Sequence, residues 1–143
     1  MRLHETRTIK RPLDEVFAFT ADFSNSAKWD PGVESSELVG SGPIGVGSRF
    51  SLVTTFGSSR TPMEYVIEEF EENSRVVLHG AGGSVSAIDT IEFETHPDGT
   101  WVDYTADLTF KNWIRWVSPL LKPVMSRVVG QRALDGLVET LES

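Results

Sequence analysis

Short runs that alternate apolar and polar residues dominate the middle of the chain and predict an antiparallel sheet. Glycine-rich segments separate the runs, and successive strand side chains point to opposite faces, which gives the period of two. Pro97-Asp98-Gly99 is typical of a tight hairpin, because Asp-Gly readily adopts the positive φ angles of such turns. Together with a first run rich in Thr and Ile, the pattern predicts strands over residues 3–10, 33–39, 48–56, 61–71, 75–80, 85–95 and 100–111.

Two other segments follow the helical spacing of three and four residues. The first covers residues 13–23 and comes directly after Pro12, which ends a strand and suits the start of a helix. A short turn that carries Lys28 and Trp29 follows this helix.

The second helical segment runs from Trp113 to the end of the chain and presents two apolar faces. These faces are rotated by roughly 120° from each other, so we expect the first half to cover a concave sheet and the second half to close the core. Ser118 and Pro119 are typical of an N-cap and a first helical residue. Pro123 and Gly130 lie within the pattern and predict a kink.

Length and composition favour one globular domain over residues 1–143, with 39% hydrophobic and 24% charged residues. The 13 Lys and Arg against 21 Asp and Glu give a net charge of −8, which argues against nucleic acid binding and peripheral membrane docking. There is no cysteine, so disulfides and thiolate sites are excluded. No apolar run resembles a signal peptide or a membrane span. We therefore expect a cytoplasmic protein, a monomer or a homodimer, without stable membrane insertion.

Two patterns that suggest cofactors or metals have simpler explanations. Residues 40–45 match Gly-x-Gly-x-x-Gly, but a strand follows them, whereas the dinucleotide fingerprint needs a helix N-terminus at that point. His4, His79 and His96 lie in separate strands without the spacing of metal ligands. We therefore expect neither a cofactor nor a metal.

Four local sequences stand in an order and spacing shared with a known family. They are residues 8–17 (Thr-Ile-Lys-Arg-Pro-Leu-Asp-Glu-Val-Phe), Asp22-Phe23 with residues 28–32 (Lys-Trp-Asp-Pro-Gly), residues 46–50 (Val-Gly-Ser-Arg-Phe) and residues 104–108 (Tyr-Thr-Ala-Asp-Leu). Together they resemble the START-like (SRPBCC) superfamily and, within it, the polyketide cyclase/dehydrase-like group. Arg11 stands where that family usually has alanine. The resemblance covers nearly the whole chain.

The resemblance implies an α+β helix-grip fold. In this fold a curved seven-stranded antiparallel sheet wraps around a long C-terminal helix, and two short helices follow the first strand. Between sheet and helix lies an elongated cavity, which members use for lipids, sterols, aromatic polyketides, hormones or quinones. Some members are enzymes and many only bind, so the fold alone does not give a reaction.

Asp89 and Tyr104 are the candidate catalytic residues. Strand alternation places Asp89 on the side of the apolar Ile91, and Tyr104 on the side of Ala106, so both face the cavity from neighbouring strands. Burial would raise the pKa of the carboxyl and suit it to acid–base work, with the phenol stabilising an enolate oxygen. The alternative is that Asp89 only orients the polar end of a ligand. A bulge after Gly83 would turn Asp89 outward.

Ligand contacts are expected from the concave face of the sheet, from Trp29 and from the apolar stripe of the C-terminal helix. The predicted set is Trp29, Phe50, Leu52, Thr54, Tyr65, Ile67, Leu78, Asp89, Ile91, Tyr104, Ala106, Val117, Leu120, Leu121, Val124 and Val128.

Three functions remain open. The first is binding of a hydrophobic small molecule, such as a lipid, a polyketide or an aromatic compound, in the cavity. The second is a cofactor-independent polyketide cyclase or dehydratase that uses Asp89 and Tyr104. The third is a protein-interaction or co-chaperone module with a collapsed cavity and an exposed apolar patch from Trp101, Trp113 and Trp116.

Overall fold

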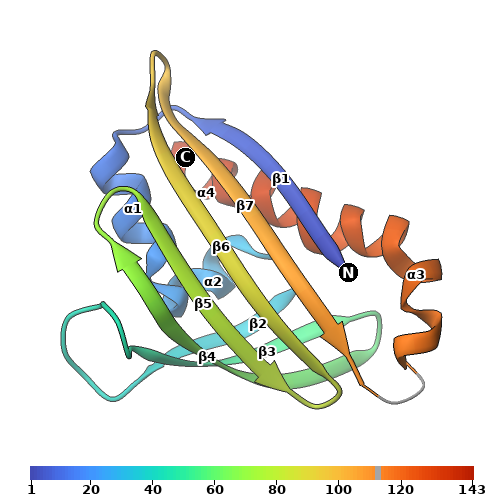
Figure 1. The fold of residues 1–143 in the computed structure, drawn as a ribbon. Helices are drawn as coiled ribbons and strands as arrows, with labels where there is room; N and C mark the ends of the chain where they lie inside the picture. Colours follow the sequence, from blue (N-terminus) through green and yellow to red (C-terminus); the bar gives the residue numbers. More distant parts are fainter. Residues whose placement is uncertain (112–113) are drawn as a thin grey trace.

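One curved antiparallel sheet frames the computed structural model, which describes residues 1–111 and 114–143 (Figure 1). Within these residues seven strands pair in the order β1-β7-β6-β5-β4-β3-β2. The strands are β1 Arg2–Ile9, β2 Val33–Val39, β3 Arg49–Phe56, β4 Ser59–Glu71, β5 Arg75–Gly82, β6 Val85–His96 and β7 Gly99–Phe110. The predicted strands are confirmed, with ends that differ by a few residues. Consecutive strands from β2 to β7 are neighbours, and β1 pairs with β7 at the opposite edge from β2.

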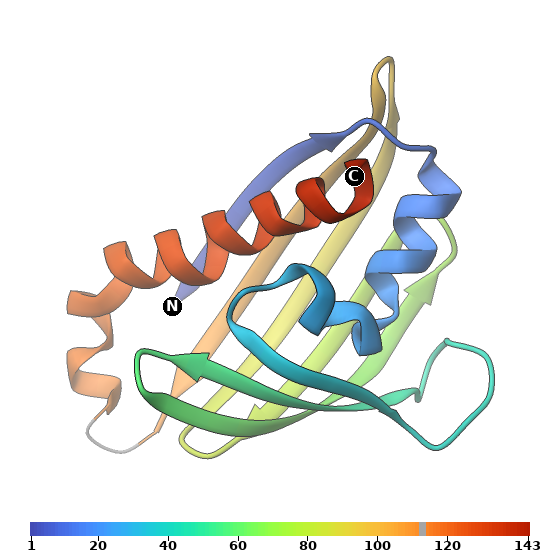
Figure 2. The same cartoon turned by 180° about the vertical axis from the view of Figure 1, so that it is seen from behind.

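The helices lie on the concave side of the sheet (Figure 2). After β1 come α1 Leu13–Ala21, a 3₁₀ turn Phe23–Asn25 and α2 Ser26–Trp29. The first helix is shorter than predicted, because the Asp22 carboxylate accepts a hydrogen bond from the Ser24 N–H at 3.0 Å and so caps the 3₁₀ turn. The two short helices expected after the first strand are confirmed.

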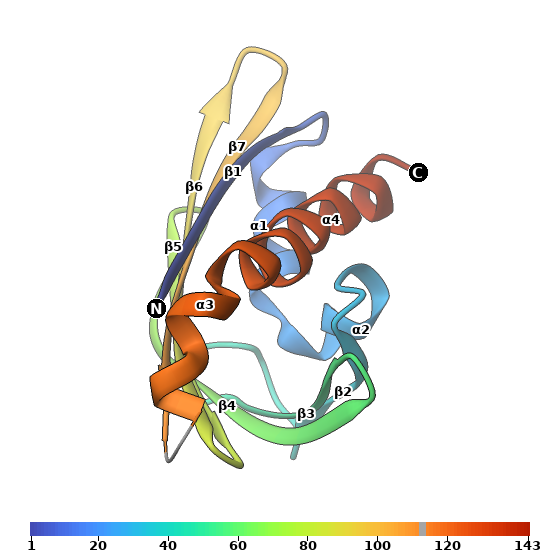
Figure 3. The same ribbon diagram turned by 90° about the vertical axis from the view of Figure 1, so that its right-hand side faces the viewer.

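The C-terminal helix has three consecutive parts. These are α3 Ile114–Met125, a π-helical segment Ser126–Gln131 and α4 Arg132–Glu142. The π-helical segment lies close to the predicted kink and contains Gly130, and Figure 3 shows that the helix axis bends between the first turns of α3 and α4. The predicted N-cap at Ser118 is wrong, because the helix already begins at Ile114 and holds Pro119 in its interior. Trp113, the predicted start, lies outside the described residues.

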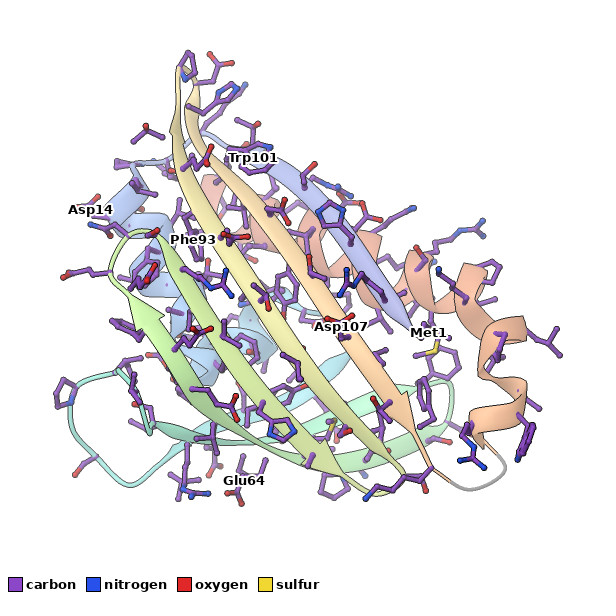
Figure 4. All side chains as sticks on the ribbon, viewed as in Figure 1. Met1, Asp14, Glu64, Phe93, Trp101 and Asp107 are labelled. Atoms are coloured by element: carbon purple, nitrogen blue, oxygen red, sulfur yellow. The ribbon has the colours of Figure 1, made fainter. Side chains whose placement is uncertain are left out.

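The core lies between the sheet, α1 and α4. Phe17 of α1 makes edge contacts with Phe70 and Phe93, at ring-centroid distances of 5.2 and 5.0 Å. Leu134 and Leu137 of α4 are fully buried in the same cluster, so the second half of the helix closes the core as predicted. Figure 4 shows the other side of the sheet, where Glu64 and Asp107 project from the convex face. The first half of the C-terminal helix, α3, contributes no described residue to this core cluster.

Candidate functional site

A cavity of about 490 Å³ lies between the concave face of the sheet and the helices α2, α3 and α4. Most of its lining side chains are apolar. Asp30, Asp89, Tyr65 and Tyr104 supply carboxyl and phenol groups beside α2, and further hydroxyls come from the β3–β4 hairpin and the β5–β6 turn, namely Thr54, Thr55, Ser59, Thr61 and Ser84. The cavity extends to the β3–β4 hairpin, where Phe56 and Ser59 are exposed. Figure 2 shows this hairpin and α3 at the same end of the molecule. The carboxyls of Asp30 and Asp89 therefore lie at the inner end of the cavity, and the end next to α3 combines apolar side chains with Thr and Ser hydroxyls.

Asp89 and Tyr104 form the centre of this inner end. Asp89 lies opposite Ala106 across the β6–β7 pair, and Tyr104 lies opposite Ile91, so the two side chains are diagonal neighbours on one face. The Tyr104 hydroxyl donates a hydrogen bond of 2.5 Å to Oδ2 of Asp89. Both residues line the cavity, as the alternation of β6 and β7 predicts. The described pairing of β6 continues in register to the turn at Gly82–Val85, so the outward rotation by a bulge does not occur.

The surroundings of Asp89 favour its protonated form. Burial raises its pKa from the ordinary 3.8 to about 7, the hydrogen bond from Tyr104 opposes this increase, and the negative charges of Asp30 and Asp107 add to it. Burial likewise raises the pKa of Tyr104 well above its ordinary value, as does the charge of Asp89. The same two causes act on Tyr65, which also lines the cavity. Near neutral pH the site therefore holds two neutral phenols and a carboxyl that can gain or lose a proton.

Asp30 is a second carboxyl of the cavity, and the sequence places it only in the turn segment 28–32 that carries the family resemblance. Burial raises its pKa to about 6, while a 2.8 Å hydrogen bond from the Gly32 N–H to Oδ1 lowers it. Its role in the cavity was missed because a turn has no periodicity from which to predict a direction. Its position directly after Trp29, a predicted cavity residue, was the available signal.

Trp29 forms the wall beside these carboxyls. It is buried, and its ring meets that of Tyr104 edge-on at a centroid distance of 6.5 Å. Its position depends on a close approach between α2 and α4, because a Cβ at Gly136 would overlap the Trp29 carbonyl oxygen. Within the described part of the chain, the Trp29 Nε1 and the Ser26 Oγ are buried without a hydrogen-bond partner.

Ten predicted ligand contacts line the cavity. They are Trp29, Leu52, Thr54, Tyr65, Asp89, Tyr104, Ala106, Val117, Leu121 and Val128. Four others lie in the packed core and not in the cavity wall, namely Phe50, Ile67, Leu78 and Ile91. Alternation correctly places these four on the inner side, since they are almost completely buried. It gives no information on which part of that side the helices fill.

Leu120 and Val124 do not face the cavity, contrary to the sequence expectation. Leu120 is 80% exposed and Val124 is 50% exposed, whereas Val117 and Leu121 line the cavity. The apolar stripe of α3 is wider than the face that meets the sheet. At about 100° per residue, Leu120 lies on the edge of that stripe, turned away from the inward Leu121.

Other cavity residues are absent from the predicted contact set, although Met63, Leu108 and Met125 share the inner face of predicted contacts two or four residues away. They include Leu3, Phe23, Met63, Val85, Leu108 and Met125. Met125 shares the helical face of Leu121, so a wider inward arc around Leu121 was the signal that could have found it.

The histidines and the glycine-rich loop lie apart from this cavity. His4 pairs with Asp103 at 2.8 Å on the surface, and the loop that contains residues 40–45 leads into strand β3. Among residues 1–111 and 114–143, no three His, Asp or Glu side chains are placed to hold a metal ion. In the same residues, no helix is long and apolar enough to cross a bilayer.

Comparisons with known proteins agree with the fold. The family described as polyketide cyclase / dehydrase and lipid transport matches residues 1–142. TTHA0849 from Thermus thermophilus superposes with a TM-score of 0.80 at 20% identity, covering 99% of this chain and 97% of that one. A START superfamily protein from Mycobacterium smegmatis gives 0.74 at 16% identity, with 99% and 94% covered.

Ara h 8.0201 also has a similar structure, with a TM-score of 0.66 at 15% identity and coverage of 99% and 95%. No protein in the curated set matches the chain significantly. The expected α+β helix-grip fold and the START-like resemblance are confirmed.

Proposed function

The chain belongs to the polyketide cyclase/dehydrase and lipid transport family, and we propose that it binds an apolar small molecule between its sheet and its C-terminal helix. The observation that carries this proposal is the cavity of about 490 Å³. Typical ligand pockets are of this size, mostly apolar, with a few convergent polar groups. A cavity of this volume argues against the protein-interaction module, because that hypothesis expects the cavity to be collapsed.

The distribution of polar groups suggests the kind of ligand. The Tyr65 and Tyr104 hydroxyls and the carboxyls of Asp30 and Asp89 lie at one end, and the rest of the wall is apolar apart from Glu5 and several Thr and Ser side chains. A pure hydrocarbon would leave these buried polar groups without new partners, which costs free energy when water is displaced. We therefore expect a lipid-like or aromatic molecule with a carbonyl or hydroxyl at its inner end.

A matched pair of tryptophan substitutions on α3 tests the binding site. Leu121 lines the cavity and its neighbour Leu120 is exposed, so Leu121→Trp fills the cavity and Leu120→Trp does not. With the neutral fluorescent probe N-phenyl-1-naphthylamine, Leu121→Trp should reduce uptake at least tenfold, while Leu120→Trp should retain it. Thermal unfolding of both variants checks that the fold persists. Equal uptake by Leu121→Trp and the unmodified chain would exclude this cavity as the site.

A second candidate function, cofactor-independent cyclisation or dehydration, is favoured by the Asp89–Tyr104 pair. The Asp89 carboxylate would remove a proton from carbon next to a substrate carbonyl, and the Tyr104 hydroxyl would donate to the enolate oxygen. The enolate carbon would then form a bond to a second carbonyl carbon, whose oxygen takes up the proton. A pKa of about 7 suits Asp89 to both transfers.

This reaction is tested with a poly-β-keto compound and two isosteric variants. Asp89→Asn should abolish turnover and Tyr104→Phe should lower it by at least tenfold, while both keep the uptake of the neutral probe. Turnover that survives in Asp89→Asn would exclude Asp89 as the acid–base group and leave binding as the function.

A further inference from the structure

The outer face of α3 exposes three large apolar side chains. Trp116, Leu120 and Val124 recur every four residues and are 74%, 80% and 50% exposed. Side chains with this spacing share one side of a helix, so they form a stripe, here called the outer stripe. In the described part of the chain no element packs over these three residues to bury them. A contiguous exposed stripe of this kind marks an interaction surface.

The segment around the outer stripe has the opposite charge to the rest of the chain. Residues 108–134 contain none of the 21 Asp and Glu, although the chain has a net charge of −8. They contain five of its 13 Lys and Arg, which are Lys111, Arg115, Lys122, Arg127 and Arg132. All five side chains are exposed. Among the described residues, no ion pair engages Lys122 or Arg127, so their charge is available to an anionic surface.

We propose that α3 docks this protein on the surface of an anionic phospholipid bilayer, with the outer stripe in the headgroup region. A helix with exposed apolar residues and surrounding basic residues is typical of interfacial membrane binding, and tryptophan favours that interface. The net charge of −8 does not oppose this local contact. Charges further away than the Debye length, about 10 Å at 0.1 M salt, are largely screened.

Two other occupants fit the surface less well. A second copy of the chain on the same face would bring the basic residues of one α3 close to those of the other, and like charges across an interface are unfavourable. A nucleic acid would pair with the basic side chains, but it offers no apolar region for Leu120 and Val124. An anionic lipid surface matches both features, because its apolar region takes up the stripe and its headgroups attract the basic side chains.

The adjoining face of the same helix connects this surface to the cavity. Val117, Leu121 and Met125 line the cavity at the end where α3 lies. Docking through the outer stripe would therefore bring that end of the cavity to the bilayer, where an apolar ligand could enter or leave without crossing water. This exchange route rests on the proposed binding function, whereas the docking does not.

Vesicle co-sedimentation of the full chain tests the docking. The chain should bind phosphatidylcholine vesicles with about 30% phosphatidylglycerol at least tenfold more tightly than vesicles without it, and salt should weaken binding. Trp116→Ser with Leu120→Ser should reduce binding at least tenfold. The matched control is Val39→Ser with Val46→Ser, because these side chains are 53% and 69% exposed elsewhere. It should bind like the unmodified chain.

A charge-matched pair of variants separates local charge from net charge. Lys122→Glu with Arg127→Glu should abolish binding to the anionic vesicles. Lys10→Glu with Lys28→Glu changes the net charge by the same amount on exposed side chains elsewhere, and it should leave binding within about twofold. Equal losses in the two double variants would contradict a local docking surface.

Three further results would overturn the proposal. They are absence of binding to anionic vesicles, equal loss in the apolar control, and a dimer in gel filtration that Trp116→Ser dissociates without any vesicle binding. Probe uptake is measured in parallel. Trp116→Ser with Leu120→Ser should retain uptake, so a failure of docking and a failure of the cavity as a binding site give different results.

Discussion

Replacing Asp89 with asparagine should change how the stability of the protein depends on pH. In the unfolded chain this carboxyl loses its proton near pH 3.8, while in the folded protein it keeps the proton to about pH 7. Between these values the unfolded state is favoured as pH rises, because it binds fewer protons. At about 1.4 kcal/mol for each pH unit, Asp89 lowers the free energy of unfolding by about 4 kcal/mol between pH 3.8 and 7. Above pH 7 it causes no further loss.

An asparagine at this position keeps the shape of the carboxyl and removes the titration. Its side-chain oxygen can still accept the hydrogen bond of Tyr104. At pH 4.5, where Asp89 is protonated in the folded state, the variant should match the unmodified chain within about 1 kcal/mol. At pH 8 it should be more stable by about 2–4 kcal/mol.

Urea unfolding of both proteins at several pH values measures this difference. Asp30, whose pKa is raised to about 6, adds a decline that both proteins share, so the test lies in the difference between the two curves. Parallel curves over pH 4.5–8 would refute the assignment of a raised pKa to Asp89. A variant that is less stable at pH 8 would show that the carboxylate is stabilised in the folded state.

Three further substitutions test other parts of the site. Tyr104→Phe removes the hydrogen bond that opposes the effect of burial, so the pKa of Asp89 should rise further, as measured by NMR titration of its carboxyl carbon. Gly136→Ala should destabilise the protein by about 2–4 kcal/mol in urea unfolding, although alanine favours helices, because its Cβ overlaps a carbonyl oxygen of α2. Thr100→Val should cost about 1–2 kcal/mol in the same assay, because the buried Thr100 hydroxyl donates a 2.8 Å hydrogen bond to the Arg11 carbonyl. An unchanged pKa in Tyr104→Phe, or an unchanged free energy of unfolding in Gly136→Ala or Thr100→Val, would contradict the reason given for that substitution.

The sheet could be predicted from sequence because its signals are local. Alternation and glycine-rich turns gave the strands, and the phase of β6 and β7 placed Asp89 and Tyr104 on one face, where they form a hydrogen bond. Alternation assigns a side chain to a face but not to a position along it. Phe50 and Ile91 were therefore expected to contact ligand, although they lie in the core. That distinction depends on where α1 and α4 pack, which is a long-range property.

The helix was harder to predict for a related reason. The apolar stripe on this helix is wider than the surface that it covers. The stripe alone therefore does not show which of its residues face the cavity, and it could not distinguish the exposed Leu120 from the inward Leu121. The wide stripe itself carried information, because its outer part is the surface proposed to dock on a bilayer. The net charge of −8 hides this surface, because it adds the five positive charges of residues 108–134 to the larger excess of negative charge in the rest of the chain.

The most direct test of the binding claim is NMR of the methyl groups in the presence of the neutral probe. If the probe occupies the cavity, intermolecular nuclear Overhauser effects should reach the methyl groups of Val85, Val117 and Leu121, which line it. The methyl groups of Leu120, on the outside of the same helix, should show none. Contacts to Leu120 without contacts to Leu121, or to surface methyl groups alone, would contradict a ligand bound between sheet and helix.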